Sequence, residues 1–237
     1  MHLILVLFAS VLAGFTQTVS GFGCGIVLML FLPMILSILR ASALNVMIGL
    51  VLNLLLVIQY RKHINLRLVV LPALLSFVLT TVAIEVGASL QLDLLKNVFC
   101  CFLIVLALYF MFFADRIHIK ANFLSISICS SISGIANGLF GIGGPPMVLY
   151  YLAVTKDKKE YIGTIQMFFL VNSIYSTLVR VMNRLIDVEL VMLFVPGVIG
   201  VFIGQWLGMK VGDRIPQKQF KQMIYLFLIV SGVLTLL

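Results

Sequence analysis

The stretch "SGIANGLFGIGGPPMVLYYL", residues 133–152, interrupts the backbone in the middle of apolar sequence. Four of the seven residues from Gly138 to Gly144 are glycines, and two prolines follow directly. Both residue types are unfavourable in the interior of an ordinary helix. The stretch therefore predicts a break between two helices, in a segment that its neighbours would otherwise bury.

The composition predicts the environment of this break. Of the 237 residues, 62% are hydrophobic and only 10% are charged, whereas a soluble domain has about 25% charged residues. Such a small share of charged side chains cannot cover a surface exposed to water. We therefore expect an all-α, polytopic protein of the cell (inner) membrane. The net charge of +8 comes from basic residues between apolar segments. This placement is typical of cytoplasmic loops and argues against a nucleic-acid partner.

Simple membrane spans can be marked directly, because a helix needs about 20 apolar residues to cross a bilayer. Two further apolar stretches, 3–39 and 123–152, are too long for one span, and each contains a glycine cluster. The first cluster is "SGFGCG", residues 20–25, and the second is the stretch quoted above. The simple spans are 41–60, 68–90, 92–113, 161–181, 188–209 and 220–237.

The two broken segments belong to an internal repeat. "GFTQTVSGFGCG" from Gly14 and "GIANGLFGIGGP" from Gly134 align at an offset of 120 residues, and the offset slips to 119 further along. Each copy is one broken segment followed by three spans, which is typical of transporters. We assign 1–113 to the first repeat, 114–120 to a linker and 121–237 to the second repeat. The matched pairs include Gly14 and Gly134, Gln17 and Asn137, Gly21 and Gly141, Gly23 and Gly143, Asn53 and Asn172, and Arg61 and Arg180.

The distribution of basic residues predicts that the copies are inverted. If each broken segment enters and leaves on the same face, as a re-entrant hairpin or a pair of helices, twelve of the sixteen Lys and Arg residues fall on one face. If each broken segment crosses once, the split is seven to nine. The excess of Lys and Arg on the cytoplasmic side of membrane proteins favours the first arrangement, with both termini outside the cytoplasm.

The matching breaks predict a binding cavity between the halves, because irregular backbone survives in a bilayer only where protein buries it or water reaches it. A half-helix that starts at a break offers unpaired N–H groups and the positive end of its dipole, which together bind anions. The alternative is that the glycines only let helices pack closely. The candidate substrate-binding residues are Gln17, Gly21, Gly23, Cys24, Asn53, Asn137, Gly141, Gly143, Gly144, Pro145, Gln166 and Asn172.

Several side chains have two interpretations. The paired amides either line an anion site or join helices by hydrogen bonds. Glu85, the only acidic residue more than two residues inside a predicted span, either couples transport to a proton or sodium ion or reaches interfacial water. Arg180 lies at a span end, where it either attracts anions or, as we favour, extends to the interface. The glycines at every fourth position from Gly200 to Gly212 predict close packing against the other copy or a second subunit of a homo-oligomer.

At these residues the chain resembles the TauE/SafE family of sulfite-exporter-like membrane proteins. The resemblance rests on the two glycine motifs, on the two-copy layout, and on "LPALLSF" and "VPGVIGVFIGQWLG" at matching spans. It implies transport of a small anion, such as sulfite, a sulfonate or a related organic acid, driven by an ion gradient. Cys24 stands where the second motif has Gly144, and Pro145 and Pro146 have no match in the first motif, so the two halves of the site differ chemically.

The leading hypothesis is therefore a secondary transporter, and by resemblance an exporter, that binds its anion at two opposed helix starts and alternates access between the inverted copies. An anion channel is the nearest alternative. A membrane-embedded enzyme is less favoured, because the three histidines lie at segment edges and no nucleophile–base or metal-ligand set emerges. We predict no cofactor and no metal site.

Overall fold

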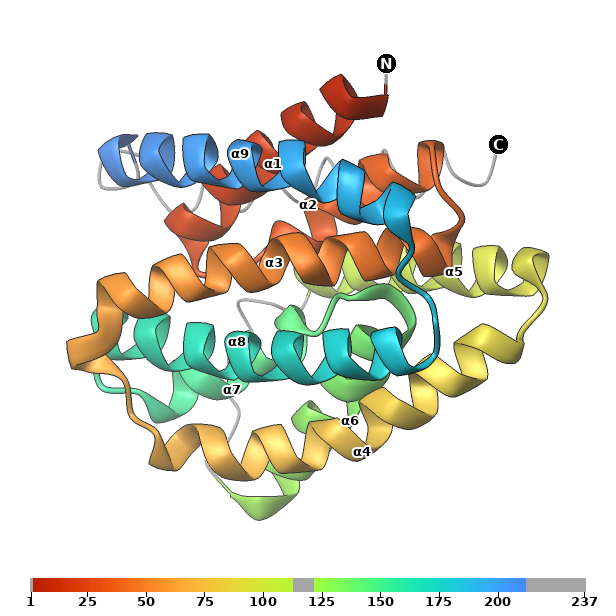
Figure 1. Cartoon of the computed structure of the whole chain (residues 1–237). Coiled ribbons are helices and arrows are strands. Elements are labelled where there is room, and N and C mark those ends of the chain that lie inside the picture. Colours follow the sequence, from red (N-terminus) through yellow and green to blue (C-terminus); the bar gives the residue numbers. More distant parts are fainter. Residues whose placement is uncertain (1, 113–121, 212–237) are drawn as a thin grey trace.

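The structure of the protein is a computed structural model that describes residues 2–112 and 122–211. Over these residues the chain is helical, with no strand (Figure 1). The predicted linker 114–120 and the predicted span 220–237 lie outside the described residues. The helices of the first copy are α1 (His2–Ser20), α2 (Cys24–Phe31), α3 (Ile38–Tyr60), α4 (Arg67–Ser89) and α5 (Leu92–Phe112), with short 3₁₀ helices η1 (Leu32–Met34) and η2 (Arg61–His63). The second copy contributes α6 (Phe123–Phe140), α7 (Gly144–Val154), α8 (Lys158–Met182) and α9 (Val188–Val211).

Helices α1, α3, α4, α6, α8 and α9 are long and apolar enough to cross a bilayer. The outer face of α4 shows why lipid is the solvent, since apolar side chains at every fourth position from Val70 to Val86 are exposed. Water would not stabilise such a surface, whereas acyl chains contact it without cost. The protein is therefore a multi-pass membrane protein.

Helices α2 and α7 are too short to cross a bilayer. They contain 8 and 11 residues, so at 1.5 Å per residue they reach about 12 and 17 Å, against a hydrocarbon core of about 30 Å. Each lies against the longer helix that precedes it, α1 or α6. Both over-long apolar segments are thus pairs of helices, one long and one short.

The long helices end in the same local geometry at the two breaks. Gly21 and Gly141 both adopt positive φ angles, of 82° and 70°, which glycine adopts without steric cost. The N–H of Gly21 donates to the carbonyl of Gln17 at 2.8 Å, and the N–H of Gly141 donates to the carbonyl of Asn137 at 2.9 Å. A left-handed glycine that closes the last turn is a common way to end a helix. The glycine pattern therefore ends α1 and α6 in the same manner.

Helices α3 and α8, which match each other in the repeat, run antiparallel through the middle of the molecule (Figure 1). Ser42, near the start of α3, lies 3.3 Å from the guanidinium of Arg180 near the end of α8. At the opposite end, the N–H of Asn65, which follows α3, donates to the hydroxyl of Thr164 near the start of α8 at 3.0 Å.

The outer helices pair between the copies rather than within them. Helix α1 packs along α9, and α6 packs along α4. Gly200 and Gly204 of α9 lie against the backbone of α1 at Leu7 and Val11, where a Cβ atom would collide. Gly208 likewise lies against Thr18 of α1. The described glycines of this every-fourth-position series therefore pack against the first copy of the same chain. Gly212 lies outside the described residues.

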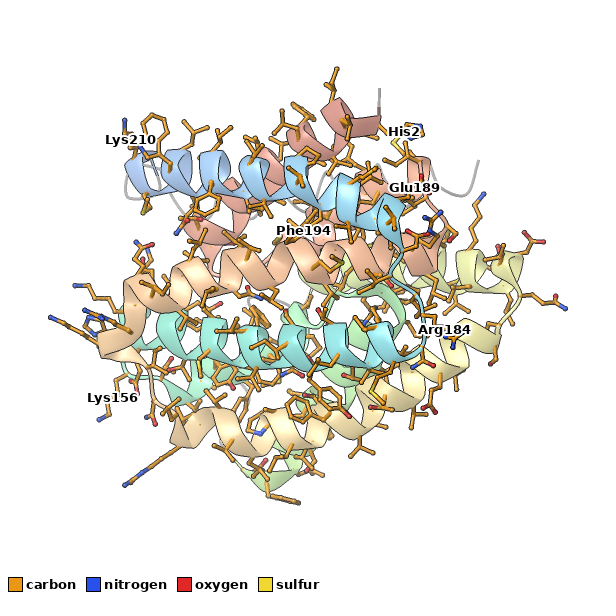
Figure 2. The ribbon with its side chains drawn as sticks, viewed as in Figure 1. His2, Lys156, Arg184, Glu189, Phe194 and Lys210 are labelled. Carbon is orange, nitrogen blue, oxygen red and sulfur yellow. The ribbon has the colours of Figure 1, made fainter. Side chains whose placement is uncertain are left out.

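Charged side chains gather at the two ends of the long helices. Lys156 and Lys210 lie at one end, whereas His2, Arg184 and Glu189 lie at the other (Figure 2). At this second end, the guanidinium of Arg40 contacts the carboxylates of Asp187 at 2.7 Å and Glu189 at 2.8 Å. The N–H of Leu190 donates to Asp187, and this bond, with Arg40, holds the pKa of the Asp187 carboxyl below its usual value. The polar ends flank an apolar middle, as a bilayer requires.

Candidate functional site

The two breaks enclose a cavity of about 60 Å³. A cavity needs at least about 10–15 Å³ to hold one water, so this one has room for a small cluster of waters or an ion of a few heavy atoms. The residues around it come from both copies, including the starts of α2 and α7 and the middles of α3 and α8. Of the candidate residues, these line it: Gln17, Gly23, Cys24, Asn53, Asn137, Gly141, Gly143, Gly144, Pro145 and Asn172.

The two breaks contact each other in the wall of this cavity. A Cβ atom built on Gly25, in the first turn of α2, would lie 2.7 Å from the carbonyl oxygen of Gly141. No side chain larger than hydrogen fits at Gly25 unless the two breaks separate. The glycine in the first motif thus has a close partner in the second copy, which sequence alone does not reveal.

The two short helices both begin at the cavity but present different groups. The first N–H groups of any α-helix lack partners within the helix. At α2, the N–H of Cys24 donates to the side-chain oxygen of Gln17 at 3.2 Å, and Gly25 and Ile26 line the cavity. At α7, Gly143 precedes the helix, and Pro145 and Pro146 occupy the first turn without N–H groups. The start of α2 is therefore the richer source of backbone donors.

Most of the amide side chains already have partners from neighbouring helices. The amide nitrogen of Gln17 donates to Asn53 at 2.6 Å and to Gln166 at 2.9 Å. Asn53 in turn donates to the hydroxyl of Ser173 at 3.1 Å, and Gln166 donates to the carbonyl of Gly21 at 2.7 Å. Gly21 and Gln166 are candidate residues that support the cavity wall without lining the cavity.

Asn172 also has hydrogen-bond partners at both polar atoms of its side chain. Its side-chain oxygen accepts the hydroxyl of Ser76 at 2.6 Å, and its nitrogen donates to the carbonyl of Phe168 at 3.0 Å. For Gln17, Asn53, Gln166 and Asn172, the contacts match the interhelical hydrogen bonds that were one of the two sequence interpretations.

Asn137 differs from its repeat partner Gln17. It lines the cavity, and its side-chain nitrogen is buried without a hydrogen-bond partner. A buried N–H donor without an acceptor costs about 1–3 kcal/mol. Asn137 is therefore the candidate amide in the cavity wall whose nitrogen has no described hydrogen-bond partner.

Asn45 is a cavity residue that sequence analysis missed. Its side-chain nitrogen lies 3.2 Å from the carbonyl of Gly141 and 3.3 Å from that of Gly25. It lies on α3 of the first copy yet binds the second break, just as Gln166 of α8 binds the first break. Each central helix therefore closes the break of the other copy. The repeat did not reveal Asn45, because the matched residue is Thr164.

The sulfite exporter TauE/SafE family model matches residues 6–235, which include both breaks and nearly the whole chain. The chain belongs to the TauE/SafE family. This is a family of membrane transporters of the sulfite and anion type rather than of enzymes. No curated protein and no solved structure matches the chain.

Arg180 of this TauE/SafE protein is fully buried, so the favoured interpretation, extension to the interface, is wrong. One guanidinium nitrogen, Nη2, donates to the carbonyls of Asn137 at 3.1 Å and Gly138 at 2.8 Å. The other, Nη1, contacts the hydroxyl of Ser176. The reason for the difference is that α8 faces protein at this level, so the arginine binds the end of α6 instead of reaching water.

The structure places Glu85 away from the cavity. Its side chain is exposed on α4 and does not belong to the cavity wall. Coupling through Glu85 therefore stays a prediction. Among residues 2–112 and 122–211, no group of three His, Cys, Asp or Glu side chains is arranged to hold a metal ion.

Proposed function

We propose that this TauE/SafE protein is a secondary transporter that exports a small anion, such as sulfite, a sulfonate or a related organic acid. The anion binds in the cavity between the starts of α2 and α7. The observation that carries this proposal is that two helix starts and the unpartnered amide of Asn137 converge on one cavity. The backbone N–H groups, the helix dipoles and that amide all favour negative charge.

The proposed binding mode suits a small oxyanion. The cavity has about 60 Å³ of space, which matches an ion of a few heavy atoms and excludes a large solute. The donors are neutral, so an ion can bind and leave without breaking a strong ion pair. Lining residues such as Phe168 and Phe169 give the cavity apolar walls, which strengthen these interactions by excluding water.

We further propose that the copies are inverted, that both termini lie outside the cytoplasm, and that one copy rocks against the other. Three features support this. The matched helices α3 and α8 run antiparallel; the pairing of α1 with α9 is reciprocated by α6 with α4; and Lys156 and Lys210 gather at one end of the molecule (Figure 2). Inverted repeats with broken helices at the midplane support alternating access in many transporters.

A proton or sodium gradient is the proposed driving force, with Glu85 as the candidate coupling residue.

Asn137 supplies the direct test of the anion site. In purified full-length protein, we expect thermal stabilisation by at least one of sulfite, sulfate, thiosulfate, a short sulfonate or a carboxylate. Asn137→Ala removes one hydrogen bond to a charged ligand, worth about 1.5–3 kcal/mol, so the Kd should rise about tenfold or more. The measurement is the unfolding temperature as a function of anion concentration.

The matched control is Asn183→Ala, because the Asn183 amide donates to the carbonyl of Val179 at 2.9 Å and lies outside the cavity wall. This variant should bind the anion with unchanged affinity. If none of the anions stabilises folded wild-type protein, or if both variants lose affinity equally, the proposed site is wrong.

Cys24 offers a native reporter that separates a carrier from the alternative, a channel. It is a buried free thiol in the cavity wall. In a variant with Cys100, Cys101 and Cys129 replaced by alanine, a carrier exposes Cys24 to one side at a time. We therefore expect that a transported anion, added to proteoliposomes, changes the rate of labelling by a membrane-impermeant thiol reagent in opposite directions on the two sides. Equal slowing from both sides, with flux that does not saturate, would indicate a channel.

A further inference from the structure

We infer that Arg180 is the fixed positive charge that sets the charge preference of the cavity, so that doubly charged anions bind more tightly than singly charged ones of the same shape. This inference rests on the proposed function and names the substrate class of the same site. Arg180 does not line the cavity; it acts from behind the wall, through the end of α6.

The burial of Arg180 lacks the usual compensation. Its side chain is fully buried, and no described carboxylate lies within ion-pair distance of it. Its partners are neutral: the backbone carbonyls of three residues and the hydroxyls of Ser42 and Ser176. Its Nε atom is buried without a partner. Because buried charges are normally paired with an opposite charge, the arrangement is short of one negative charge.

The position of Arg180 explains where that negative charge would lie. The carbonyls that it binds, those of Asn137 and Gly138, belong to the last turn of α6. The end of a helix carries a partial negative charge, which would repel an anion in a cavity lined by Asn137 and Gly141. The guanidinium offsets this repulsion and adds a full positive charge behind the wall, where protein rather than water lies between the charges.

The first break shows that a helix end of this kind does not need an arginine. It has the same left-handed glycine geometry at Gly21. The carbonyl of Gly21 accepts the neutral amide of Gln166 at 2.7 Å, as the carbonyl of Gly141 accepts that of Asn45 at 3.2 Å, and no described arginine hydrogen-bonds the end of α1. Arg61, the repeat partner of Arg180, is exposed in η2. The positive charge of Arg180 thus exceeds what closing a break requires, and its electrostatic effect on the cavity is the remaining role.

The test compares two anions of similar shape and different charge, sulfate and methanesulfonate, on the purified full chain. We expect wild-type protein to bind sulfate more tightly. Arg180→Gln removes the positive charge and keeps a side-chain amide that can donate to the end of α6. It should lower sulfate affinity about tenfold to a hundredfold, and methanesulfonate affinity by roughly the square root of that factor, since interaction energy scales with charge.

Arg180→Lys separates charge from shape. It keeps the positive charge and loses the planar fork, so the ratio of the two affinities should stay within about threefold of wild type. A purely structural role would lower the unfolding temperature in both variants and leave the ratio unchanged. An unchanged ratio in Arg180→Gln overturns the inference alone. Failure of folded wild-type protein to bind either anion contradicts the inference and counts against the proposed function as well.

Discussion

Replacing Gly49 with leucine is expected to abolish anion binding while the protein stays folded. Gly49 lies within α3 and lines the cavity, and a Cβ atom built there meets nothing within 4 Å. The four carbons of a leucine side chain would therefore enter the space of about 60 Å³ that the anion needs. Because leucine is a better helix former than glycine by nearly 1 kcal/mol, α3 itself should not lose stability.

The measurement is again anion-dependent thermal stabilisation. An anion at a hundred times its Kd stabilises the wild-type protein by about 2.7 kcal/mol, and Gly49→Leu should remove this stabilisation. Gly49→Ala adds one methyl group and should give an intermediate Kd. Ala88→Leu, on the exposed face of α4, is the control for added leucine and should bind normally. Tight anion binding by folded Gly49→Leu would show that the anion binds elsewhere.

Adding a single methyl group at Gly204 is expected to destabilise the whole protein. A Cβ atom there would overlap the carbonyl oxygen of Val11 and lie 2.8 Å from the backbone nitrogen of Phe15. Both are backbone atoms of α1, so only a shift of the entire helix relieves the collision. Overpacking of this kind costs about 1–3 kcal/mol, which outweighs the gain in helix propensity. We expect Gly204→Ala to unfold at a clearly lower temperature in detergent.

Gly49→Ala is the matched comparison, because it makes the same chemical change in a long helix where the Cβ atom meets open space. It should unfold at the same temperature as wild type or slightly above it. Equal unfolding temperatures for the two alanine variants would mean that α1 and α9 do not pack as closely as described.

The described helices were predictable because a physical constraint acts on each of them. Bilayer thickness sets the length of a span, so α3, α4, α5, α8 and α9 match the predicted segments closely. The paired glycines likewise identified both breaks, since few residues other than glycine adopt the positive φ angles at Gly21 and Gly141. The pairing of α1 with α9 was not predictable, because the glycines of α9 indicate that some helix approaches closely without naming it.

The side chains of the site were harder to predict for a related reason. Asn45 has no amide at its matched position, so the repeat offered no signal for it. Arg180 occurs near the end of an apolar segment. An apolar segment reads the same in the sequence whether the helix faces lipid or protein, so the burial of Arg180 could not be predicted. Asn137 and Gln17 looked equivalent, yet only Asn137 keeps a free donor. Such differences depend on which helices become neighbours.

Each break receives a hydrogen bond from the central helix of the other copy. During synthesis, therefore, the first break waits for its partner and the second does not. The carbonyl of Gly21 receives its bond from Gln166, which is 145 residues further along the chain. A ribosome that adds about 5–20 residues per second needs roughly 7–30 seconds to make that partner. Through this interval the carbonyl of Gly21 lacks its Gln166 partner, and an unpaired carbonyl is costly in lipid. The second break has no such delay, because Asn45 is synthesised before Gly141. The second half can therefore form its bonds to the first half as soon as it is made.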